Sequence, residues 1–173
     1  MRDASIPDLR IRLKRHPDLS ASLTLTRRDG SATWQRQKGS LALVFPQHDL
    51  THYAVESTLG FGGAFYGLVA DGWEISDFAT PWARGPIPVE ARDVEMLVGL
   101  FDGMRPDRAA WDADEINRQL RRLVDDSRFA QRVVPRVLTD ADVVAVRQLR
   151  HSLLERWGAT GPGDAIELEF IRP

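Results

Sequence analysis

The sequence LRIRLK, residues 9–14, alternates strictly between apolar and basic side chains. A period of two residues is typical of a β-strand with one buried face. The alternation returns in SLTLT (22–26), and after the turn pair Asp29-Gly30 the sequence ATWQR (32–36) predicts a third strand. The first forty residues therefore predict an antiparallel meander. Its expected apolar face consists of Leu9, Ile11, Leu13, Leu23, Leu25 and Trp34.

The C-terminal sequence AIELEFI, residues 165–171, alternates in the same way and predicts a fourth strand. Its polar face carries Glu167 and Glu169, whereas the polar face of residues 9–14 is basic. Opposite charges stabilise neighbouring strands when they lie directly across from each other. We therefore expect the N- and C-terminal strands to pair directly.

Helices are predicted between these strands. The apolar run 41–45, closed by Pro46, is either a short strand or a buried segment that leads into a helix ending at Gly60. Apolar spacing and capping residues predict further helices over 64–70, 89–103, 113–126 and 140–158. The sequence thus predicts a single α+β domain over residues 1–173, with an antiparallel sheet packed against four or five helices.

Composition excludes several classes of protein. The chain has 173 residues, a formal net charge of −2 and no cysteine. Thiolate metal sites and disulfide scaffolds are therefore excluded, and a dedicated nucleic-acid binder would carry a basic excess. No apolar stretch is long enough to span a membrane, and residues 1–16 contain no apolar segment of the kind that signal peptides carry. We expect a cytoplasmic protein with a small-molecule ligand and with neither nucleic acid nor membrane as partner; the sequence leaves the oligomeric state open.

The sequence HDLTH, residues 48–52, carries the candidate chemistry. On a helix, His48, His52, Asp49 and Glu56 fall within an arc of roughly 100°. Imidazole and carboxylate groups bind metals or transfer protons, and the chain has no cysteine to compete. We expect His48, His52 and Glu56 to bind a divalent metal, zinc before others, with Asp49 as a catalytic base or as a group that orients a ligand.

Further ligands are expected from the irregular segment 73–88, which is long enough to cover the cluster. Glu74 and Asp77 are the additional candidates in that segment. The sequence HDLTH is similar to the HExxH helix of zinc metallopeptidases, with Asp49 at the position of their catalytic glutamate. It more loosely resembles the HDxxH segment of a family of ubiquinone-biosynthesis proteins, whose further glutamate lies later than Glu56 does here.

Two functions follow from this cluster. The first is a metal-dependent enzyme, of hydrolase type, that uses the cluster on the helix 48–60. The second is a non-enzymatic domain that binds a small ligand or a protein, with the same cluster as the floor of a polar pocket and Trp73, Trp82 and Tyr53 as walls. A purely structural interpretation also stands, in which Asp49 is the N-cap of a helix that starts at Leu50 and His52 is a core residue.

Overall fold

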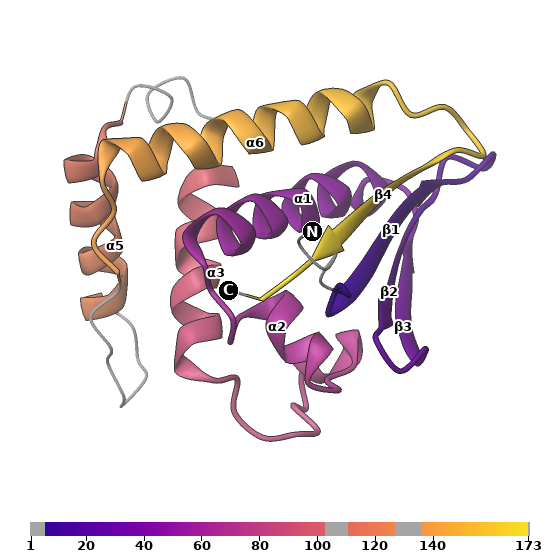
Figure 1. The fold of residues 1–173 in the computed structure, drawn as a ribbon, viewed down its shortest axis with the longest axis horizontal. Coiled ribbons are helices and arrows are strands. Elements are labelled where there is room, and N and C mark those ends of the chain that lie inside the picture. The colour runs from indigo at the N-terminus through magenta and orange to yellow at the C-terminus, as the bar shows by residue number, and fades with distance from the viewer. Residues whose placement is uncertain (1–5, 103–110, 127–135, 173) are drawn as a thin grey trace, which may run out of the picture.

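The computed structural model describes residues 6–102, 111–126 and 136–172, and consists of a four-stranded antiparallel sheet with helices on one face (Figure 1). The strands β1 (Leu9–Arg15), β2 (Ala21–Arg27), β3 (Ala32–Gln37) and β4 (Ala165–Phe170) lie in the order β3-β2-β1-β4. The helices are α1 (Leu41–Leu59), α2 (Phe65–Ala70), the 3-10 helix η1 (Ile75–Phe78), α3 (Val89–Asp102), α5 (Ala113–Asp126) and α6 (Asp140–Gly158). The expected α+β fold is confirmed.

Strands β1 and β4 pair directly, as the charges on their outer faces predict. Arg10 lies opposite Glu169 and Arg12 opposite Glu167, with 3.6 Å between Nε of Arg12 and Oε1 of Glu167. Both side chains of the latter pair are more than half exposed, so the pair adds only about 0–1 kcal/mol. The alternation of buried and exposed residues along β1 stabilises the sheet far more, because it places one apolar row against the helices.

Strand β3 differs from the prediction in which of its faces is covered. Trp34, expected in the core, is 67% exposed and lies opposite Thr24 on the outer face of the sheet. The alternation instead turns Thr33, Gln35 and Gln37 toward the helices. The prediction for Trp34 was wrong because the register of an edge strand is set by its partner strand, and residue type alone does not reveal that register. Two amide side chains consequently lie on the helix-covered face.

Helix α1 begins at Leu41, so residues 41–45 are its first turns and form neither a strand nor a separate segment. Pro46 lies inside the helix, where it cannot donate the hydrogen bond that the carbonyl group of Ala42 would otherwise accept. Ala42 and Pro46 are both buried, and this packing offsets the missing hydrogen bond. The helix ends at Gly60, which has a φ of 73° and donates its N–H to the carbonyl group of Glu56.

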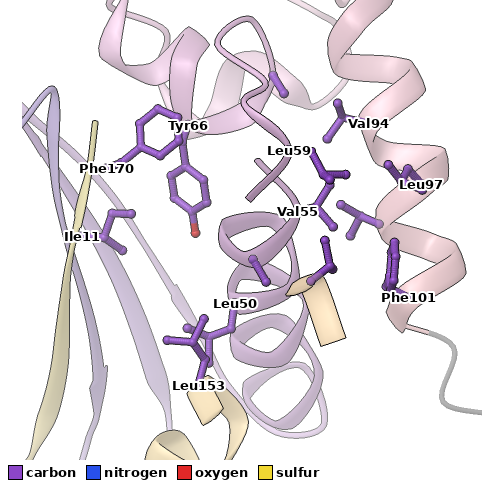
Figure 2. Close-up of a cluster of buried hydrophobic side chains, with 14 of the residues drawn as sticks. Ile11, Leu50, Val55, Leu59, Tyr66, Val94, Leu97, Phe101, Leu153 and Phe170 are labelled. Carbon is purple, nitrogen blue, oxygen red and sulfur yellow. The ribbon is translucent and has the colours of Figure 1, made fainter. Parts of the chain in front are cut away.

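Helix α1 runs between the sheet and the outer helices, and this position decides the chemistry of the site (Figure 2). On one side, Leu50 lies toward the sheet and α6; on the other, Val55 and Leu59 face α3. Ten residues of α1 are buried, including the charged or polar residues Asp49, His52 and Glu56. Polar side chains on the buried faces of such a helix need a partner, either another protein group or water in a cavity.

The other helices begin and end close to the predicted residues. Helix α5 follows Asp112, whose Oδ1 accepts the backbone N–H of Glu115 at 2.9 Å. Helix α6 follows Thr139, which forms a capping box with Asp142. The predicted last residue of α3, Gly103, lies outside the described residues. None of the described helices is long and apolar enough to cross a membrane.

Candidate metal centre

The two histidines of α1 point toward the same carboxylate on the neighbouring helix α3. Nε2 of His52 lies 2.9 Å from Oε2 of Glu95, and Nε2 of His48 lies 3.5 Å from Oε1 of the same side chain. The two imidazole rings meet edge to face, with 4.7 Å between their centroids. One donor atom from each of the three residues lies within 4.8 Å of the others. These three side chains could therefore hold one metal ion between them.

The second nitrogen of each imidazole is held by a different carboxylate. Nδ1 of His48 donates to Oδ2 of Asp102 at 2.6 Å, and Nδ1 of His52 donates to Oε1 of Glu56 at 3.0 Å. Carboxylates bonded in this way fix the ring orientation and direct the Nε2 lone pair of each ring to the opposite side. Such carboxylate–histidine pairs are typical of metal sites, because they orient the ligand and raise its basicity. The two pairs here direct both Nε2 atoms toward Glu95.

Glu56, one of these two carboxylates, is fixed by contacts deep in the core. Its side chain is fully buried, and Oε2 accepts the backbone N–H of Tyr66 at 2.9 Å. Both oxygens are thus occupied, one by the imidazole of His52 and one by the first turn of α2. Glu56 therefore orients His52 from behind, on the side away from Glu95.

Asp102, the other carboxylate, is fixed by α1 and α6 together. Its Oδ1 accepts the hydroxyl hydrogen of Thr51 at 2.5 Å. The hydroxyl oxygen of Thr51 in turn accepts the Nε–H of Arg150, which reaches in from α6 and is only 6% exposed. The guanidinium group also lies 3.6 Å from Oδ1 of Asp102. Helices α1, α3 and α6 therefore all contribute to the orientation of His48.

The electrostatics of the group favour a protonated His52 when no metal is bound. Burial opposes the charged form, but the hydrogen bonds and charges of Glu56 and Glu95 outweigh it and raise the pKa of His52 to about 10. The same hydrogen bond from His52 lowers the pKa of Glu95. Burial opposes ionisation of Asp102, yet the hydrogen bonds from His48 and Thr51 lower its pKa. A metal ion that binds Nε2 of His52 must therefore displace a proton.

Asp49 lies next to this group and is 6% exposed. Burial raises its pKa to about 7, against the opposing charges of His52 and His48. The interpretation of Asp49 as the N-cap of the helix is wrong, because α1 begins eight residues earlier at Leu41 and Asp49 lies well inside it. A carboxyl group that titrates near neutral pH beside a candidate metal centre is typical of a general acid or base.

The group forms one end of a cavity of about 620 Å³, which is within the ordinary size range of small-ligand sites. His48, Asp49, His52 and Glu95 all line it. Its other walls are mainly apolar and come from five elements and the segments that join them. They are Phe45, Phe65, Ile75, Phe78, Ala79, Ile87, Ala91 and Met96, with Gln35, Gln37 and Arg92 as the polar contributors.

The residues predicted from the sequence occupy three different places. His48 and His52 point into the cavity, whereas Glu56 is bonded to Nδ1 of His52 and lies outside the group of three donors that could hold an ion. Glu74 pairs with an arginine of β2, and Asp77 accepts the backbone N–H of Glu74 and pairs with another arginine. Neither of these carboxylates lines the cavity. The segment 73–88 does contribute apolar walls through Ile75, Phe78, Ala79 and Ile87.

Sequence reasoning missed Glu95 and Asp102, which are two of the four acidic residues of α3. They are seven residues apart, so they lie on one face of the helix, close to its apolar stripe. Two acidic residues at that spacing, beside residues such as Leu97 and Phe101 that enter the core, were the available signal. The sequence could not reveal that this face of α3 packs against His48 and His52, because α2, η1 and the loops around them separate the two helices along the chain.

An ion held by the three donors of His48, His52 and Glu95 at the wall of the cavity would have room for water or a further ligand. The comparison of the chain with models of known families, with curated proteins and with solved structures gave no match.

Proposed function

We propose that this protein is a divalent-metal-dependent hydrolase, with His48, His52 and Glu95 as the metal ligands. One observation carries the proposal: both Nε2 atoms face Glu95, while each Nδ1 atom is bonded to a separate carboxylate, that of the buried Glu56 or that of the partly buried Asp102. A histidine placed in a core for packing alone needs a partner for each polar atom, but it does not need its neighbour to converge on the same point. Convergence with oriented tautomers is what a metal ion requires.

The charge balance around the histidines supports an ion of charge +2. Four carboxylates gather there, those of Asp49, Glu56, Glu95 and Asp102. Arg150 is the guanidinium group hydrogen-bonded into this network. Negative charge in a partly enclosed site is costly unless it is compensated. A divalent cation between His48, His52 and Glu95 that displaces the proton of His52 adds one net positive charge to the site. Zinc suits two imidazoles and one carboxylate, a donor set known from zinc hydrolases.

Asp49 is the candidate general base. It lines the cavity beside the two histidines and is one residue from His48 on the same helix. In this function, an ion held by the three ligands supplies a Lewis acid for a carbonyl oxygen. Asp49 accepts a proton from the attacking water and then delivers it to the leaving group. Glu56 and Asp102 keep the imidazoles in position through their bonds to the two Nδ1 atoms.

A non-enzymatic ligand-binding domain is the second candidate, and the cavity favours it. Most of the lining is apolar, and apolar walls bind a ligand whether or not chemistry follows. The two candidates differ in what happens to the bound compound. The test incubates an ester or amide with protein that has been shown to contain zinc. Recovery of the unchanged compound supports a non-enzymatic binding domain over a hydrolase.

Metal content tests the proposal directly. The protein is dialysed against a chelator, titrated with zinc, and analysed for bound metal and thermal stability. The wild type should bind one ion per chain, and zinc at 100 times its Kd should stabilise the fold by about 2.7 kcal/mol. His52→Ala should bind none, whereas His151→Ala, at an exposed histidine on α6, should bind as the wild type does. Wild-type protein that takes up no zinc, manganese or iron would overturn the proposal.

A further inference from the structure

The walls of the cavity indicate what kind of molecule it takes. Beginning at the metal centre, aromatic rings follow one another along one wall: the centroid of Phe65 lies 5.6 Å from that of His52, and the centroid of Phe78 lies 4.9 Å from that of Phe65. Ile87 and Met96 add aliphatic surface to the same cavity. A substrate whose reacting group is at the ion must therefore place its neighbouring atoms against apolar surface. Such surface favours alkyl or aryl groups by about 25 cal/mol for each Å² buried.

The polar groups of the cavity away from the ion include two neutral amides. Gln35 and Gln37 point inward from the edge strand β3, and the amide nitrogen of Gln37 donates to the amide oxygen of Gln35 at 3.2 Å. Carboxamides offer hydrogen-bond donors and acceptors without net charge. They suit a neutral polar group on a ligand, such as an ester or amide.

The charges near the cavity also favour a neutral substrate. Among the residues that the structure describes, the carboxylates of Asp49 and Glu95 and the guanidinium group of Arg92 line the cavity. The charge of Arg92 also acts on Asp93, its neighbour in α3, where it opposes the rise in pKa that burial causes. Sites for phosphoryl groups instead present an excess of positive charge to the phosphate oxygens. The described lining residues supply two carboxylates and one guanidinium group, so they add no excess of positive charge to that of the ion.

We infer that the substrate is a neutral ester or amide with an apolar acyl group, alkyl or aryl, of a size that fits about 620 Å³. This inference rests on the proposed hydrolase function and names its substrate class. The reaction is a hydrolysis without change of oxidation state. The oxygen of water adds to the carbonyl carbon, the proton of water passes to Asp49, and the bond from carbon to the leaving oxygen or nitrogen breaks as that atom takes the proton. The products are a carboxylic acid and an alcohol or amine.

Hydroxamates test the inference by binding alone, because they coordinate zinc and carry the acyl group as a variable tail. Acetohydroxamate, benzohydroxamate and octanohydroxamate are titrated into the zinc-loaded protein by calorimetry, with phenylphosphonate as the anionic comparison. Benzohydroxamate and octanohydroxamate should each bind at least about tenfold more tightly than acetohydroxamate, since six methylene groups or a ring become buried. Phenylphosphonate should bind more weakly than benzohydroxamate.

Two substitutions at lining residues that are not metal ligands distinguish binding of the hydroxamate tail by the apolar walls from binding of the zinc ion. Ala91→Leu narrows the cavity from α3, and Phe78→Ala removes part of the aromatic wall. Each should reduce the affinity for octanohydroxamate at least about fivefold while zinc and acetohydroxamate bind as in the wild type. Ala141→Leu makes the same exchange as Ala91→Leu at an exposed position of α6 and should change none of the three affinities.

The possible failures are distinguishable. A wild-type protein that does not bind zinc would overturn the proposed function. Zinc binding together with hydroxamate affinities that do not depend on the tail, or with phenylphosphonate as the tightest ligand, would overturn the substrate class and leave the metal site standing. In steady-state assays of the zinc-loaded protein, p-nitrophenyl octanoate should have a kcat/KM at least about tenfold above that of p-nitrophenyl acetate. In the same assays, p-nitrophenyl phosphate should not be cleaved.

Discussion

Replacing Glu95 by glutamine should separate metal binding from stability, because this carboxylate is the exposed member of the network. Its side chain is 58% exposed and contacts Nε2 of both histidines. Half-exposed ion pairs contribute little, so the free energy of unfolding of the metal-free protein should fall by no more than about 1 kcal/mol. Zinc affinity should fall by at least about 100-fold, since replacing even an outer partner of a ligand costs roughly 10–100-fold.

Glu56→Gln provides the contrast, because that side chain is fully buried and bonded to His52 and to the backbone of Tyr66. Removal of one partner from a buried ion pair costs about 3–5 kcal/mol, so this variant should lose stability even without metal. Glu155→Gln is the matched control, since Glu155 pairs with His151 on the surface of α6 at 3.3 Å. It should change neither stability nor zinc affinity.

The assay combines urea denaturation of chelator-treated protein with zinc titration against a chromophoric chelator. The reasoning would be refuted if Glu95→Gln bound zinc as tightly as the wild type. It would also be refuted if Glu95→Gln lost as much stability as Glu56→Gln, because the carboxylate of Glu95 would then be part of a structural network rather than a ligand.

Three further predictions address protons, caps and packing. Zinc binding at pH 8 should release about one proton from His52, which calorimetry in buffers of different ionisation enthalpy measures. In the metal-free protein, the raised pKa of His52 should stabilise the fold fully below pH 6.5. This contribution to the free energy of unfolding should be lost as the pH rises through about 10. Thr139→Ala should cost about 1 kcal/mol in thermal unfolding because it removes the cap of α6, whereas Thr139→Ser should be nearly neutral. Gly67→Ala should destabilise the fold by at least about 2 kcal/mol, because the added Cβ would lie 1.8 Å from the carbonyl oxygen of Gly62. A Cβ added at Gly99 would meet no atom within 4 Å, so Gly99→Ala should stabilise the helix by up to about 1 kcal/mol.

The sheet was largely predictable because its information is local. Strict alternation along residues 9–14 and 165–171 fixed the buried rows, and opposite charges on the outer faces of the two strands indicated their pairing. Trp34 shows the limit of this reasoning: its alternation was read correctly, but the face it occupies depends on the register with β2. The start of α1 shows another, since a short apolar run before a proline does not distinguish strand from helix.

The candidate site was predictable only in the part that one helix supplies. Spacing of four residues places His48 and His52 on one face of α1, and the structure has both rings directed to one carboxylate. That carboxylate, Glu95, is 43 residues from His52, and Asp102 is 54 residues from His48. Periodicity reveals the faces of a helix, but the choice of neighbouring helix is set by packing of the whole core.

The site of an added ion is the most direct test of the account. Crystals of the chelator-treated protein, soaked in zinc and measured at the zinc absorption edge, locate the ion by its anomalous signal. The account predicts one zinc ion at roughly 2.0–2.1 Å from Nε2 of His48, Nε2 of His52 and one oxygen of Glu95, with Glu56 and Asp102 still bonded to the Nδ1 atoms. A zinc ion bound elsewhere, or no ion between the two imidazoles at saturating zinc, would contradict it.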